Sequence, residues 1–109
     1  MGSLAVALGA FGAHALKGIL ERNQTGEIWK TAAFYHFIHA VMLFILADRK
    51  PFLRGAWVGF LIGILIFSGS LYLLALTNYK WLGAITPLGG ICFLAGWLWL
   101  AIGARKLAD

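Results

Sequence analysis

The sequence predicts an all-α integral membrane protein, a four-helix bundle with a short first helix. Two observations carry this prediction. Of the 109 residues, 61% are hydrophobic and 12% are charged, whereas a soluble domain is about 45–50% apolar and about 25% charged. The charged residues also gather in a few short segments, so long charge-free blocks separate them. A lipid bilayer suits such a chain, and we expect residues 1–109 to form a single transmembrane domain.

Three of the charge-free blocks are long enough to span a bilayer. A membrane-spanning helix needs roughly 20 apolar residues, and Gly55–Tyr79 and Trp81–Ala104 exceed that length. The second block reaches it if its helix begins near Thr25, a candidate N-cap, with Glu27 in the first turn. Trp29 is then expected to anchor this helix at the membrane interface. Together with the first block, the predicted helices cover 2–16, 26–47, 55–77 and 83–104.

The first block, Met1–Leu16, is marginal as a span because it rises only about 24 Å as a helix. A cleaved signal peptide needs a basic start, and no basic residue precedes Lys17, so we expect a short first helix that stays in the protein. Its abrupt start leaves open whether a natural N-terminal turn precedes it. Residues 17–24 are expected to lie in the membrane interface, with their apolar side chains dipping into it.

Four spans place both termini on one side of the membrane. We call side A the face that holds the termini and the 48–54 loop, and side B the opposite face. The basic residues of side A are Arg49, Lys50, Arg54, Arg105 and Lys106, and those of side B are Lys17, Arg22, Lys30 and Lys80. This small excess on side A favours cytoplasmic termini. Lipid headgroups account for the net charge of +5, so we expect no nucleic-acid partner.

Small residues recur on the predicted helix faces, and helices in lipid depend on such residues for close contact. The expected helix-packing positions are Gly9, Gly12, Ala13, Gly59, Gly63, Gly89, Gly96 and Gly103. Cys92, the single cysteine, lies near the face of Gly89 and is expected to be a small buried packing residue. The same glycine-rich faces favour a homo-oligomer or a membrane-protein partner.

The dipeptide Thr86-Pro87 allows two starts for the last helix. Thr86 can cap a helix that has Pro87 in its first position, or a helix from Trp81 can be kinked at Pro87. Both alternatives free backbone carbonyl groups just before Pro87. The following Gly89-Gly90 permits close approach of a helix or a ligand.

Polar residues within the spans gather at the depth of side B. They come from all four predicted helices, whereas the side A halves contain almost no polar groups. Histidine within a span is typical of proton relays, ion paths and ligand contacts, although hydrogen bonds that hold helices together are the other interpretation. The candidate polar site comprises His14, Tyr35, His36, His39, Ser68, Ser70, Tyr72 and Thr86.

Three histidines also raise the alternative of a metal or haem site. Zinc can bind His14, His36 and His39 with a water molecule, and haem needs axial histidines from facing helices. The spans contain no metal-binding motif and no carboxylate, so we expect no metal and no cofactor. The same lack of an acidic group leaves Ser68 and Ser70 without a complete triad, so we expect no enzymatic activity.

Several motifs, in order along nearly the whole chain, carry a family resemblance. They are Gly-Ala-Phe-Gly-Ala-His-Ala-Leu at 9–16, Trp29 with Thr31-Ala32, Tyr35-His36 with His39-Ala40, Phe67-Ser68-Gly69-Ser70-Leu71-Tyr72, and Thr86-Pro87-Leu88-Gly89-Gly90. The chain resembles the domain-of-unknown-function 423 family of small bacterial inner-membrane proteins, related to eukaryotic transmembrane protein 256. The resemblance implies a four-helix integral membrane protein, and it implies no substrate and no catalytic residues. Relatives typically have a longer first segment.

One leading expectation and two alternatives follow. We expect a multi-pass inner-membrane protein that self-associates or serves as an accessory subunit, with a polar site in one leaflet and a small-molecule ligand that the sequence does not identify. The first alternative is a proton or small-solute path across an oligomer. The second alternative is a metal- or haem-binding membrane protein.

Overall fold

The computed structural model describes the backbone of residues 1–49 and 53–108, and the side chains of the same residues except 13 and 104–108. Every regular element in this part of the chain is helical, so the predicted all-α class is confirmed for it. The elements are α1 (Gly2–Val6), the π-helical η1 (Ala7–Gly12), α2 (Ala13–Ala15), α3 (Lys17–Asn23), α4 (Gly26–Ala47), α5 (Arg54–Gly63), the π-helical η2 (Ile64–Ser68), α6 (Gly69–Thr77), the 3₁₀-helical η3 (Lys80–Ala84) and α7 (Thr86–Ala108).

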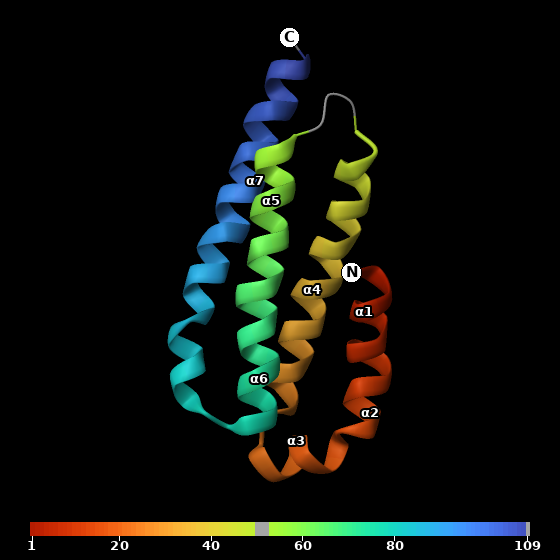
Figure 1. The fold of residues 1–109 in the computed structure, drawn as a ribbon, viewed down its shortest axis with the longest axis vertical. Helices are drawn as coiled ribbons and strands as arrows, with labels where there is room; N and C mark the ends of the chain where they lie inside the picture. Colours follow the sequence, from red (N-terminus) through yellow and green to blue (C-terminus); the bar gives the residue numbers. More distant parts are fainter. Residues whose placement is uncertain (50–52, 109) are drawn as a thin grey trace.

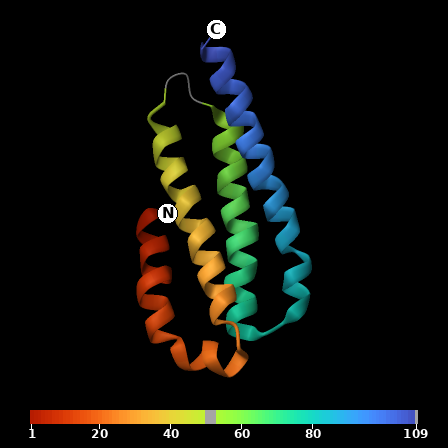
Figure 2. The same ribbon diagram turned by 180° about the vertical axis from the view of Figure 1, so that it is seen from behind.

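Four helical stretches stand side by side in a row, in the order α1–α2, α4, α5–α6 and α7 (Figures 1 and 2). The Cα envelope measures 53 × 26 × 14 Å, so the row is about half as thick as it is wide. A closed four-helix bundle has similar width and thickness. The predicted four-helix bundle is therefore not confirmed, because α1 and α7 occupy opposite edges of an open layer.

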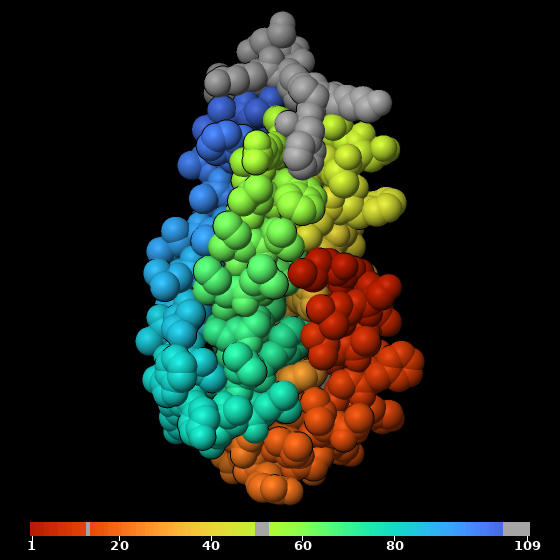
Figure 3. Space-filling model, viewed as in Figure 1, coloured from red at the N-terminus to blue at the C-terminus, as the bar shows by residue number. Residues whose placement is uncertain are grey.

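Three stretches of the described chain are long and apolar enough to cross a membrane: Gly26–Ala47, Arg54–Thr77 and Lys80–Gly103. The number rises to four if Gly2–Gly12 and Lys17–Asn23, which meet at a bend of 73°, count together as one broken span. This bend lays α3 across the end of the row (Figure 1). The N-terminus lies beside the middle of α4, so α1 covers only the part of α4 that is nearer to α3 (Figures 1 and 3).

Hydrogen bonds from the α3–α4 connection close the end of α6. Asn23 Nδ2 donates to the carbonyl oxygens of Ala75 and Leu76, each at 3.1 Å. The Thr25 hydroxyl donates to the same Ala75 oxygen at 2.7 Å, so Thr25 occupies the N-cap position of α4 but makes no side-chain cap. The expected capping role is wrong, because the hydroxyl instead satisfies a carbonyl near the C-terminus of α6 that has no partner within its own helix.

Glycine allows the closest helix contacts in the row. A Cβ added at Gly59 of α5 would lie 3.2 Å from the Cα of Gly96 on α7, and one added at Gly89 would collide with the backbone nitrogen of Phe67. At the other expected packing glycines the nearest atoms belong to side chains: Ala33 at Gly9, Trp29 at Gly12, Phe93 at Gly63, Phe60 at Gly96 and Leu53 at Gly103. The side chain of Ala13 lies outside the described part of the chain.

The position of Trp29 differs from the sequence expectation of an interfacial anchor. Its side chain is only 2% exposed. The indole N–H donates to the carbonyl oxygen of Leu8 at 2.8 Å, within the π-helical η1, and the ring fills the space left by Gly12. Trp29 therefore joins α4 to the first helical stretch.

Candidate functional site

A histidine–tyrosine pair lies buried between α4 and α6. His36 is 1% exposed, and its Nδ1 lies 3.0 Å from the hydroxyl of Tyr72. The Tyr72 ring packs on Trp29, with 4.7 Å between the ring centroids. The other ring nitrogen of His36, Nε2, is buried and has no hydrogen-bond partner within the described chain. An unpaired polar nitrogen is unfavourable in an apolar interior, so this atom is a candidate contact for a proton or a small polar molecule.

Two serine hydroxyls tie neighbouring helices together. Ser68 of η2 donates to the carbonyl oxygen of Ala32 on α4 at 2.9 Å. The hydroxyls of Ser70 and Thr86 lie 2.6 Å apart and connect α6 with α7. Thr86 also donates to the carbonyl oxygen of Leu82 at 3.3 Å. Since α7 begins at Thr86 after the separate η3 segment, Pro87 lies in its first turn.

His39 uses both ring nitrogens. Its Nδ1 lies 2.7 Å from the backbone carbonyl oxygen of Tyr35, and its Nε2 accepts a hydrogen bond from the indole N–H of Trp97 at 3.0 Å. Because the carbonyl can only accept and the indole can only donate, these bonds suit the neutral imidazole with its proton on Nδ1. The ring also stacks on Phe93, with 3.7 Å between centroids. Three groups therefore fix the orientation of this imidazole.

Sequence reasoning missed Trp97 and Phe93 as partners of His39. The last helix contains many apolar and aromatic residues, and nothing in the sequence distinguishes these two from the others. One signal was available, because an indole N–H inside a membrane span needs an acceptor. The histidines of α4 are natural candidates for that acceptor, although only the rotation of α7 decides which of them it reaches.

An open groove runs between α4 and α7 beside these rings. It has a volume of about 480 Å³. We call it the aromatic groove; it is lined by Tyr35, His39, Phe67, Pro87, Gly90, Ile91, Phe93, Leu94 and Trp97. The rings of Tyr35, His39 and Phe93 lie within 14° of parallel to one another. The Tyr35 side chain is exposed, and its hydroxyl makes no hydrogen bond within the described chain.

The eight predicted polar residues do not form one continuous cluster. The structure brings together His36 with Tyr72, Ser70 with Thr86, and Tyr35 with His39. Ser68 bonds to backbone, and His14 is exposed without a hydrogen bond to other described residues. The described residues contain no group of three or more His, Cys, Asp or Glu that suits a metal ion. His14, His36 and His39, which the zinc alternative combined, therefore do not form such a group in the described chain.

The chain matches known membrane proteins along most of its length. Residues 8–90 match a family described as "Protein of unknown function (DUF423)". The UPF0382 membrane protein YwdK of Bacillus subtilis is 44% identical over 110 residues, which cover 94% of this chain and 88% of that protein. A UPF0382 membrane protein of Haemophilus influenzae is 46% identical over 110 residues, covering 96% of this chain and 87% of the relative. No solved structure shows a significant match.

Proposed function

The chain belongs to the DUF423 family, and we propose that it is a non-enzymatic, multi-pass protein of the bacterial inner membrane that pairs with a second copy through the aromatic groove. Its four spans are the stretches α1–α2, α4, α5–α6 and α7, with both termini on the cytoplasmic side and α3 in the opposite interface. The buried polar pairs serve this role by fixing the rotation of the helices that line the groove.

The observation that carries the proposal is a hollow next to projecting side chains on the same helix. Ile91 and Leu94 stand out from α7, whereas Gly90 leaves room in the groove beside them. Two copies related by a twofold axis can each insert Leu94 into the groove of the other, which makes a contact that closes on itself. Close packing of this kind drives association in lipid, where apolar surface alone gives little preference for protein over acyl chains.

Two further features support pairing at this edge of the row. In the most apolar part of Lys80–Gly103, 17% of residues are buried, compared with 33% for Gly26–Ala47 and 39% for Arg54–Thr77. Tyr35, whose hydroxyl makes no hydrogen bond within the described chain, also lines the groove within a predicted span. A hydroxyl without a partner in hydrocarbon is unfavourable, so a second chain that supplies an acceptor gains free energy there.

Thiol cross-linking in native membranes tests the proposed contact. Cys92 is first replaced by alanine, which removes the single cysteine. Leu94→Cys then introduces a thiol at the groove, where the leucine is 71% exposed. We expect a short bifunctional thiol reagent to convert this variant to covalent dimer, because the twofold contact brings the two introduced thiols near one another.

The matched control is Leu65→Cys in the same cysteine-free chain. Leu65 is 58% exposed on η2 and does not line the groove. We expect this variant to give no covalent dimer under the same treatment. Equal cross-linking of the two variants would indicate random collision, and absence of cross-linking at position 94 would contradict the proposed contact.

One observation favours a second candidate function, a proton or small-solute path across the oligomer. The buried Nε2 of His36 has no partner, and Nδ1 of the same ring contacts Tyr72. Such an arrangement is typical of relay residues within spans. If this candidate is correct, His36→Phe will abolish flux into proteoliposomes while His14→Phe, at an exposed histidine, will not. Equal flux in both variants and the unmodified protein would contradict it.

A further inference from the structure

A polar hollow lies where α3 turns into α4. It has a volume of about 390 Å³. We define the polar hollow by its lining residues, which are Lys17, Leu20, Glu21, Gln24, Gly26, Glu27 and Lys30. Two lysines and two glutamates therefore face one small space, and their formal charges cancel. This composition suits a ligand that carries one positive and one negative group.

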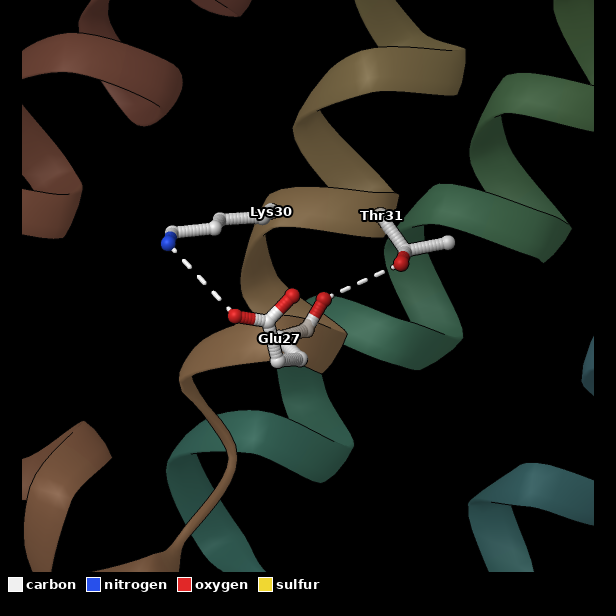
Figure 4. Close-up of polar contacts among 3 residues, drawn as sticks. All are labelled: Glu27, Lys30 and Thr31. Carbon is white, nitrogen blue, oxygen red and sulfur yellow. Dashed lines mark hydrogen bonds and ion pairs between the residues drawn. The ribbon is translucent and has the colours of Figure 1, made fainter.

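The charges in the polar hollow are available to a ligand. Lys30 Nζ lies 3.5 Å from a Glu27 carboxylate oxygen, and Lys17 Nζ lies 4.0 Å from one of Glu21. All four side chains are more than two-thirds exposed. Figure 4 shows the Lys30 side chain reaching toward Glu27 on one side of α4, whereas Thr31 points to the other side and donates to the Glu27 backbone oxygen at 3.0 Å. Exposed ion pairs are worth only about 0–1 kcal/mol, so a ligand can exchange with them at small cost.

An apolar furrow lies next to the polar hollow, along the α1–α4 contact. Its volume is about 360 Å³. The furrow is lined by Ala5, Val6, Gly9, Ala10, Trp29, Lys30, Ala33, Phe34 and Phe37. Lys30 lines both spaces, so the charged space and the apolar space meet at its side chain. A headgroup-sized hollow beside a narrow apolar furrow has the outline of a phospholipid.

We propose that the polar hollow and the apolar furrow together bind one phospholipid of the phosphatidylethanolamine class. The lipid phosphate lies against Lys17 and Lys30, its primary ammonium against Glu21 and Glu27, and one acyl chain in the furrow. This inference rests on the membrane placement given above, in which α3 lies in the interface.

The charge pattern separates this lipid from other bilayer lipids. An anionic phosphatidylglycerol headgroup satisfies the lysines but leaves both glutamates beside added negative charge. A phosphatidylcholine headgroup is zwitterionic, but its quaternary ammonium has no N–H to donate to a carboxylate. Charge-assisted hydrogen bonds are stronger than contacts without a donated hydrogen, so the primary ammonium is the preferred group.

Lipid retention provides the test. The full chain is reconstituted into bilayers of equal parts phosphatidylethanolamine, phosphatidylcholine and phosphatidylglycerol, released into mild detergent, and examined by native mass spectrometry for bound lipid. We expect phosphatidylethanolamine to be enriched about fivefold over the other two lipids, which corresponds to about 1 kcal/mol because tenfold is 1.4 kcal/mol. The double variant Glu21→Gln, Glu27→Gln should lose this preference and favour phosphatidylglycerol.

Two further variants make the outcome specific. Lys80→Gln removes an exposed lysine of the same predicted membrane side that lines neither space, and it should retain the preference. Ala10→Phe places a ring in the furrow at an exposed position and should reduce total lipid retention. Retained lipid that mirrors the bulk mixture, or an unchanged preference in the double glutamine variant, would overturn the proposal. Selective retention by a protein that stays monomeric would contradict only the pairing proposed above.

Discussion

Gly89→Ala should destabilise the protein by about 2–3 kcal/mol, near the upper end for overpacked interiors. The added Cβ would collide with the backbone nitrogen of Phe67, where α7 crosses η2. A side chain can rotate away from a new methyl group, but the backbone of a packed helix cannot. Relief therefore requires the two helices to separate, which also strains the nearby Ser70–Thr86 hydrogen bond. The free energy of unfolding in lipid bicelles, measured by steric trapping, tests this expectation.

Gly69→Ala is the matched control for that measurement. A Cβ at Gly69 has no neighbour within 4 Å. Alanine is favoured over glycine within helices by roughly 0.5–1 kcal/mol, so this variant should be neutral or slightly more stable. Equal destabilisation by both alanines would show that close contact at position 89 is not what holds α7 in place.

Trp29→Ala should be at least as damaging, with an expected loss of about 3–5 kcal/mol. The substitution removes a fully packed indole, its hydrogen bond to Leu8, and the ring that fills the space beside Gly12. It also leaves the Tyr72 ring without its aromatic neighbour. Since these contacts join the first helical stretch to α4, hydrogen exchange in 2–15 should rise more than in α7.

Trp81→Ala provides the comparison at an exposed tryptophan. Its side chain is 63% exposed in η3, and exposed substitutions usually change stability by no more than about 0.5 kcal/mol. A loss of stability in Trp29→Ala that is no larger than that in Trp81→Ala would contradict the joining role. Unchanged exchange in 2–15 would do the same.

The helical membrane class could be predicted because it follows from one physical requirement. Backbone groups in hydrocarbon must be paired within their own segment, so charge-free blocks of sufficient length become helices. The open row could not be predicted in this way. Amphipathic periodicity orders helices in water, but a span faces lipid as apolar as a protein interior, so the pattern does not distinguish a covered face from an exposed one. Small residues such as Gly59 indicate close contact without naming the neighbour.

The candidate site could likewise be predicted from the sequence only in part. Depth along a helix is readable from sequence, because each residue adds about 1.5 Å. Helix rotation and tilt decide the rest. His36 meets Tyr72 and His39 meets Trp97, while His14 is left exposed. The roles of Trp29 and Thr25 were misjudged for a related reason. The expected roles were interfacial anchor and N-cap, but both side chains donate hydrogen bonds to backbone carbonyls of neighbouring helices.

We propose above that two copies of the chain pair through the aromatic groove. Native mass spectrometry of the protein released gently from its own membranes tests it most directly, because the number of chains is read without a label or a cross-linker. We expect a particle of two identical chains. We also expect Gly90→Leu, which fills the groove, to release monomers of unchanged helical content. A single chain as the sole species from unmodified membranes would contradict pairing through the aromatic groove. A dimer that Gly90→Leu leaves intact would contradict it as well.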